Sequence, residues 1–138
     1  MNTLSAIPAD AVHYTKEQFI ETFQVDRAFL ETLLEDGIAL PVSQDDFTDK
    51  EASIVSLVAY FQRVGVDYAI LKAYVAHAKA LSELECTMQA QLCDQRSDEN
   101  FSTLWKIMFE TLFSAKEYIF KRHTYRAIVN ALKDELLK

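Results

Sequence analysis

The fold of this chain is decided by residues 14–37, which read YTKEQFIETFQVDRAFLETLLEDG. Thr15 and Asp26 each stand just before a run in which apolar residues recur at helical spacing, which is where a helix N-cap belongs. The pattern therefore predicts one helix over Lys16–Phe23 and a second helix that starts after Asp26. Gly37 follows the second run, at the position that a left-handed C-cap favours. Two short helices joined by a tight turn form a helix-turn-helix shape.

Glycine and proline are scarce, because the 138 residues include only two of each, whereas average usage predicts roughly ten glycines and seven prolines. Sheet proteins need such residues at their many turns, so the scarcity excludes sandwiches, barrels and propellers. Two isolated glycines also cannot build a glycine-rich phosphate loop. Half of the residues are hydrophobic, which is enough to bury a core. The composition predicts an all-α protein.

Further helices are predicted along the rest of the chain. Thr48 to Glu51 (TDKE) forms a capping box for a helix that Gly65 ends. Asp67 caps a longer helix whose apolar residues are spaced for pairing with another helix, namely Leu71, Tyr74, Ala78 and Leu81. The polar run DQRSDEN at 94–100 then interrupts the pattern. A strongly apolar helix over 101–120 is expected to end at residues 121–123, before a last helix that begins at Thr124.

These elements predict a head at 14–66 with a helix-turn-helix and a minimal wing, a connecting and dimerisation helix at 67–94, and a small helical C-terminal lobe at 100–138. Residues 42–46 form either a minimal hairpin or a loop. Residues 1–13 resemble a loose leader without the basic and apolar regions of a signal peptide. No apolar run is long enough to cross a membrane. We therefore expect a soluble, cytoplasmic protein.

Negative charge is concentrated at the start of the chain. The net charge is −7, and residues 1–50 hold three basic and ten acidic residues, whereas residues 51–138 hold eleven of each sign. Binding to a phosphate backbone needs lysine and arginine near the phosphates, and an acidic segment repels that backbone. The charge therefore weighs against tight nucleic-acid binding by the first third of the chain.

A family resemblance rests on several short motifs in order. They are Tyr14-Thr15, Phe19 and Phe23, Val25-Asp26-Arg27, Phe29-Leu30, Gly37-Ile38, Leu40-Pro41, Phe47-Thr48-Asp49-Lys50-Glu51 and Phe61 to Asp67. Over about residues 14–80, this order resembles the head of the MerR family of winged helix-turn-helix regulators. The resemblance implies a transcriptional regulator that binds DNA as a homodimer. It also implies the residues that contact DNA, which are Thr15, Lys16, Gln18, Arg27 and Lys50.

The sequence differs from the family pattern at the positions with which members of the family contact DNA. Arg27 is the only basic residue of the second helix, and Glu31-Thr32-Leu33 stands where the family has Arg-Tyr-Tyr. The wing, at residues 42–46, is short and lacks positive charge. An alternative therefore stays open, in which the head has lost DNA binding and acts as a protein-binding adaptor. The chain is also similar to the MerR-like co-chaperone modulators, with which it shares Val25, Phe29, Leu30, Gly37 and Ile38.

Aromatic residues gather in the C-terminal part, where Phe101, Trp105, Phe109 and Phe113 recur every four residues and Tyr118 follows. One interpretation is a pocket for an apolar effector, formed by Trp105, Phe109, Phe113 and Tyr118. The sequence favours a second interpretation, in which these side chains form the core of the lobe or a dimer interface. A basic cluster consists of Lys116, Lys121, Arg122, His123 and Arg126. We interpret it as a solvated helix face, which is favoured over a contact to DNA flanks or to an acidic partner.

The remaining reactive residues give no catalytic pattern. Cys86 and Cys93 lie two helical turns apart, a rise of about 10.5 Å, which is too far for a disulfide; buried, reduced thiols are favoured over a sensor. The three histidines are scattered, without a metal-binding pair, and no nucleophile lies in a glycine-flanked turn. We expect a protein that is not an enzyme and that holds no metal or cofactor.

Overall fold

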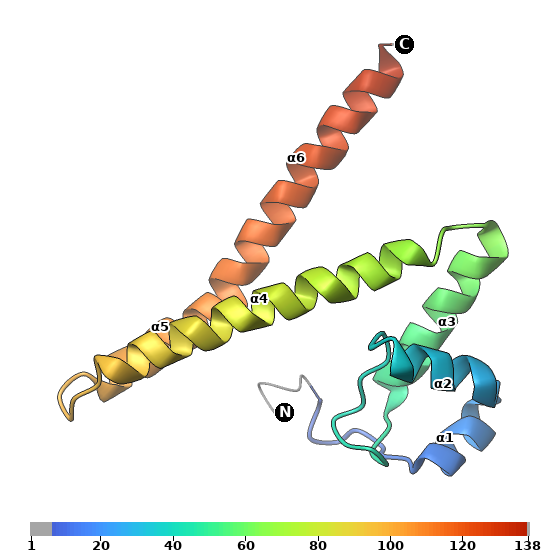
Figure 1. Cartoon of the computed structure of the whole chain (residues 1–138), viewed down its shortest axis with the longest axis horizontal. Helices are drawn as coiled ribbons and strands as arrows, with labels where there is room; N and C mark the ends of the chain where they lie inside the picture. The colour runs from blue at the N-terminus through green and yellow to red at the C-terminus, as the bar shows by residue number, and fades with distance from the viewer. Residues whose placement is uncertain (1–6, 138) are drawn as a thin grey trace. The chain divides into compact units, whose positions relative to one another are not determined.

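The computed structural model describes residues 7–137, and over this range the chain is helical, with no strand (Figure 1). The helices are α1 (Lys16–Phe23), α2 (Arg27–Glu35), α3 (Asp49–Val64), α4 (Ala69–Asp94), α5 (Phe101–Glu110), the π-helical segment η1 (Thr111–Ala115) and α6 (Lys116–Leu136). The all-α prediction is therefore confirmed. None of these helices is long and apolar enough to cross a membrane. The predicted leader falls partly on residues 1–6, which lie outside the described range.

The chain divides into two units within α4. The first unit ends at Lys79, and the second begins at Ala80.

The helices of the first unit begin at the predicted caps. Thr15 and Gln18 form a capping box, in which each side chain bonds the other residue's backbone N–H. The Asp26 carboxylate accepts a hydrogen bond from the backbone N–H of Phe29 at 2.8 Å. Thr48 and Glu51 form the second capping box at the start of α3. These local side-chain contacts satisfy backbone donors that a helix leaves free in its first turn.

Left-handed backbone conformations follow the helices where glycine was predicted to end them. Gly37 has a φ of 72° and Gly65 a φ of 82°. Gln24, directly after α1, also adopts a positive φ of 52°, which produces the tight turn between α1 and α2. The carboxylate of Asp67 accepts a hydrogen bond from Ala69 N at 2.9 Å, as the predicted cap of α4.

One hydrophobic core holds the first unit together. Its buried members come from α1, α2, α3 and the connection between α2 and α3, and they are Phe19, Leu30, Leu33, Ala39, Phe47, Val55 and Val58. The rings of Phe19 and Phe47 pack with centroids 4.9 Å apart. Tyr14 and Phe47 exchange two backbone hydrogen bonds of 2.8 Å as an isolated bridge. The segment predicted as hairpin or loop is a turn closed by one bond, from Asp46 N to Ser43 O.

The second unit consists of the C-terminal half of α4, then α5, η1 and α6. Cavity-lining residues from both helices place α4 beside α5, and Lys116 Nζ lies 3.3 Å from a Glu85 carboxylate oxygen. No residue between 80 and 137 is buried. The prediction that the aromatic row forms the core of a C-terminal lobe is therefore wrong within the single chain. Phe101 is 54% exposed and Trp105 is 43% exposed, because a pair of helices covers only one face of each.

The predicted helix boundary at residues 121–123 is also wrong. Helix α6 runs without interruption from Lys116 to Leu136. Residues 121–123 include no glycine or proline to end a helix, and Lys121 forms an ion pair with Glu117 one turn earlier at 2.7 Å, which supports helix at this point. The irregularity lies earlier, at η1, where the Thr111 hydroxyl bonds the Ile107 carbonyl at 2.8 Å.

Candidate functional site

The residues predicted to contact DNA lie on the first turns of three helices. Thr15, Lys16 and Gln18 are at the start of α1, Arg27 is the first residue of α2, and Lys50 is in the first turn of α3. Four of these five side chains are engaged with other groups of the chain, and Lys50 is the exception.

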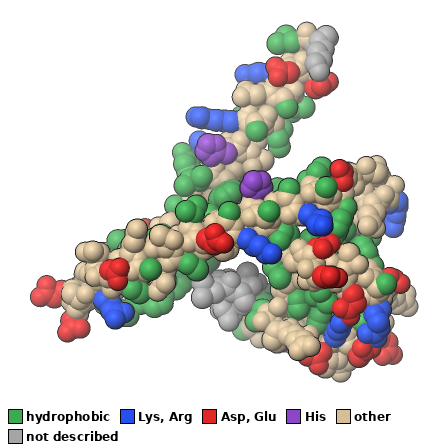
Figure 2. Space-filling view, viewed as in Figure 1, with side chains coloured by type: hydrophobic (Ala, Val, Ile, Leu, Met, Phe, Trp, Pro, Cys, Tyr) green, Lys and Arg blue, Asp and Glu red, His purple; other side chains and the backbone are tan. Residues whose placement is uncertain are grey.

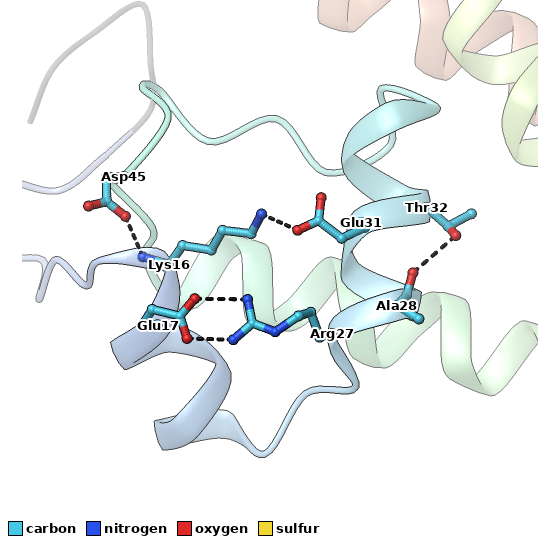
Figure 3. Close-up of polar contacts among 7 residues, drawn as sticks. All are labelled: Lys16, Glu17, Arg27, Ala28, Glu31, Thr32 and Asp45. Carbon is cyan, nitrogen blue, oxygen red and sulfur yellow. Dashed lines mark hydrogen bonds and ion pairs between the residues drawn. The ribbon is translucent and has the colours of Figure 1, made fainter.

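Arg27 is held by a carboxylate of the neighbouring helix. Its two terminal nitrogens donate hydrogen bonds to the two carboxylate oxygens of Glu17, at 2.8 and 2.5 Å (Figure 3). Paired donors and acceptors of this kind match the planar guanidinium to the planar carboxylate. The hydrogen bond from Arg27 lowers the pKa of Glu17, and the same bond raises the pKa of Arg27. The charge of Arg27 is therefore compensated within the first unit.

Lys16 is engaged at both its side chain and its backbone. Its ammonium group donates a hydrogen bond to the Glu31 carboxylate on α2, and its backbone N–H donates one to Asp45 Oδ1 at 2.7 Å (Figure 3). The Lys16 side chain is only 27% exposed. Lys16 thus connects the start of α1 to α2 and to the short loop that follows, and its charge is also compensated.

The polar candidates Thr15 and Gln18 are occupied in capping α1. The Gln18 side-chain oxygen accepts from Thr15 N at 2.9 Å, and the Thr15 hydroxyl accepts from Gln18 N at 3.2 Å. Lys50 differs from the other four, since over residues 7–137 its side chain forms no ion pair. In Figure 2, acidic and basic side chains lie intermixed on the first unit.

A groove that the sequence analysis missed lies on the same unit. This α1–α3 groove has a volume of about 560 Å³ and is lined by Phe23, Asp49, Ala52, Ser53, Ser56, Leu57 and Tyr60. Phe23, Leu57 and Tyr60 expose 37%, 45% and 58% of their surface there. The sequence signal that could have revealed it is the set of small residues Ala52, Ser53 and Ser56. Their short side chains leave a depression on one face of α3. A depression bordered by apolar side chains can accommodate apolar groups of a binding partner.

The predicted aromatic pocket is not gathered around one cavity. Phe101, Trp105, Phe109 and Phe113 form a ladder along α5 and η1, with successive ring centroids 6.1, 5.1 and 5.9 Å apart. A cavity of about 280 Å³ between α4 and α5 is lined by Trp105 but not by Phe109, Phe113 or Tyr118. Tyr118 lines a separate hollow, where Arg122 lies 4.9 Å from the centre of its ring.

The two cysteines are free thiols, and the prediction that they are buried is wrong. Cys86 is exposed and Cys93 is half-buried, because α4 packs against α5 on one side only. Gln89 Nε2 donates a hydrogen bond to Cys93 Sγ at 3.1 Å. Over the described range, no three histidine, cysteine, aspartate or glutamate side chains gather as a metal site.

Comparisons of the chain with protein-family models, curated proteins and solved structures find no match in any of the three. The resemblance to the MerR family thus stays a prediction from the sequence.

Proposed function

We propose that this chain is a protein-binding adaptor whose MerR-like head has lost DNA binding and receives a partner that is both apolar and basic. One observation carries the proposal: the two cations on the helix-turn-helix face, Lys16 and Arg27, are compensated by Glu31 and Glu17 of the same face.

The compensation weakens the main source of DNA affinity. Proteins bind duplex DNA chiefly by placing lysine and arginine against phosphates and releasing counterions. With Lys16 and Arg27 paired, Lys50 is the one basic side chain left among the five predicted contacts. The seven excess negative charges of residues 1–50 repel a phosphate backbone and attract a basic protein surface. The electrostatics therefore favour a protein partner.

The α1–α3 groove supplies a place for that partner. Phe23, Leu57 and Tyr60 offer apolar contacts, and the Asp49 carboxylate stands at the start of α3 beside them. Apolar side chains that are exposed around a hollow mark interaction surfaces more often than scattered ones do. An amphipathic helix with large apolar residues on one face and lysines at its edge matches both features.

DNA binding as a transcriptional regulator is the second candidate. It is supported by the residue order of the head and by the exposure of the Arg27–Glu17 pair, whose side chains are 52% and 70% exposed. Exposed ion pairs contribute little to stability, so phosphates can compete for such an arginine. In both candidates we propose a cytoplasmic homodimer, with α4 as a dimerisation helix and the turn at 42–46 as a minimal wing.

Binding of defined peptides tests the adaptor proposal. The probe is a fluorescein-labelled helical peptide of leucine and lysine, and its matched control replaces each lysine by glutamate. We expect the anisotropy of the leucine–lysine peptide to rise and saturate, and that of the control to stay flat. Leu57→Ser should weaken binding by about tenfold, which is about 1.4 kcal/mol.

Val64→Ser provides the matched variant, because Val64 is 71% exposed on the same helix and lies outside the groove. It should leave peptide binding unchanged. Equal binding of the two peptides, or equal weakening by the two variants, would overturn the proposal. Binding of the unmodified chain to a random-sequence duplex near 20 mM salt, lost in Arg27→Ala, would establish the DNA candidate instead.

A further inference from the structure

Helix α6 has an apolar face that no residue between 80 and 137 covers. Between Glu117 and Leu137, every residue is exposed except Val129, which is half-buried. Its large apolar side chains include Tyr125 at 65%, Ile128 at 54% and Leu132 at 56% exposure. Hydrophobic side chains are visible at the surface along this helix in Figure 2. In proteins, most of the stability of a helix comes from the packing of its apolar face.

These apolar residues form one stripe. At about 100° of rotation per residue, an arc of about 100° holds Tyr118, Tyr125, Ile128, Val129, Leu132 and Leu136. Lys121 is the one charged residue inside the arc, and its ammonium group reaches back to Glu117 at 2.7 Å. A stripe of this width is typical of a helix that packs against another element.

The two edges of the stripe carry opposite charges. Arg122, Arg126 and Lys133 follow one edge, and Glu117 and Glu135 lie along the other. The hydrogen bond and charge of Lys121 lower the pKa of Glu117, and Glu135 adds a second carboxylate near the other end of this edge. The stripe is thus bordered by a basic edge and an acidic edge.

The opposite charges of the two edges determine which binding partner is electrostatically favourable. When two identical helices pair in parallel about a two-fold axis along their length, the basic edge of each lies against the acidic edge of the other, as e and g positions do in parallel coiled coils. When they pair antiparallel, each edge lies against its like, which is unfavourable. An anionic lipid surface prefers basic residues along the polar side of a helix, and Glu117 and Glu135 oppose that contact.

We propose that α6 is a self-association helix that pairs in parallel with α6 of a second copy of this chain. The pair covers the stripe on both copies and brings Glu117 of one copy toward Arg122 of the other, five residues further along the partner helix. This interface does not depend on what the first unit binds, and it is separate from the dimerisation through α4 proposed above.

Cross-linking of single cysteines tests both contact and orientation. Tyr125→Cys and Leu132→Cys are made separately in the full chain, with Cys86→Ser and Cys93→Ser to remove the native thiols. In a parallel pair each engineered cysteine lies opposite itself, so both variants should form disulfide-linked dimers under mild oxidation. In an antiparallel pair at most one position can do so, since the two lie about 10.5 Å apart along the helix.

Two substitutions that each introduce a glutamate provide the control. Ile128→Glu lies in the stripe, whereas Ile119→Glu lies outside it, beyond the basic edge, with nearly the same exposure, 50% against 54%. We expect Ile128→Glu to lower the yield of the Leu132→Cys dimer about tenfold, and Ile119→Glu to leave it unchanged. Cross-linking at one position only, equal effects of the two substitutions, or no cross-linking at a protein concentration of about 100 µM would each overturn the proposal.

Discussion

If the head has lost DNA binding as proposed, release of the two compensated cations should restore an affinity for DNA to the first unit. The perturbation is the double substitution Glu17→Gln and Glu31→Gln, which removes the carboxylates that hold Arg27 and Lys16. Each glutamine keeps the shape of the glutamate and loses its charge. The freed guanidinium and ammonium groups stand at the starts of adjacent helices, where phosphates can reach them.

The expected size follows from counterion release. Two new phosphate contacts correspond to a slope of about −1.8 in a plot of log affinity against log salt concentration. Raising the salt from about 20 to 100 mM should therefore weaken binding by about 18-fold. Fluorescence anisotropy of a labelled random-sequence duplex measures this slope directly. The unmodified chain should show no saturable binding over the same range.

A matched variant separates released cations from a simple change of net charge. Glu21→Gln with Glu35→Gln alters the same two helices and the net charge by the same amount, but neither carboxylate forms an ion pair over the described residues. This variant should bind DNA far more weakly than the first. If the two double variants bind alike, or if the unmodified chain already shows the full slope, the reasoning from ion-pair compensation fails.

Three further predictions concern the stability of the first unit. Leu33→Ala, at a fully buried site, should lower the free energy of unfolding in urea by about 2–5 kcal/mol, while Leu40→Ala, at a 73% exposed site, should change it by less than about 0.5 kcal/mol. Gly65→Ala should cost about 1 kcal/mol in the same assay, because φ is 82° although an added Cβ meets no atom within 4 Å; an unchanged urea midpoint would contradict this. Burial, together with the hydrogen bond that its hydroxyl donates to Asp36, raises the pKa of Tyr68 to about 12. Unfolded tyrosine ionises near pH 10, so stability present below pH 10 should fall as the pH rises toward 12, and Tyr68→Phe should lose less stability over that interval than the unmodified chain.

Sequence patterns were sufficient to predict the structure wherever it depends on contacts between residues that are close together in the sequence. The capping boxes at Thr15 and Thr48, the cap at Asp26 and the left-handed turns at Gly37 and Gly65 each involve residues within a few positions of one another. Side-chain type and spacing determine such contacts, because their geometry is set by the local backbone. The bounds of α1, α2 and α3 could therefore be predicted closely.

Features that depend on distant residues could not be predicted in this way. The pairing of Arg27 with Glu17 and of Lys16 with Glu31 joins side chains on different helices. The family resemblance implied that both cations contact DNA, and only the approach of α1 to α2 in the tertiary structure pairs them with carboxylates. The α1–α3 groove has the same origin, since Phe23 and Leu57 are 34 positions apart in the sequence.

The C-terminal part also shows the difference between what local sequence predicts and what tertiary structure decides. Its residue pattern predicted a strongly apolar helix over 101–120 and a further helix from Thr124, and only the break between them, at 121–123, was wrong. Whether those apolar side chains are buried depends on how many neighbours surround each helix, and that is a property of the tertiary structure alone. Helix α5 packs on α4 along one side only, which leaves Phe101, Trp105 and Phe113 exposed, and the described residues of this unit leave the stripe of α6 largely exposed as well. Periodicity identifies which side of a helix is apolar, while only the arrangement of helices in space decides whether that side faces a core, a partner or water.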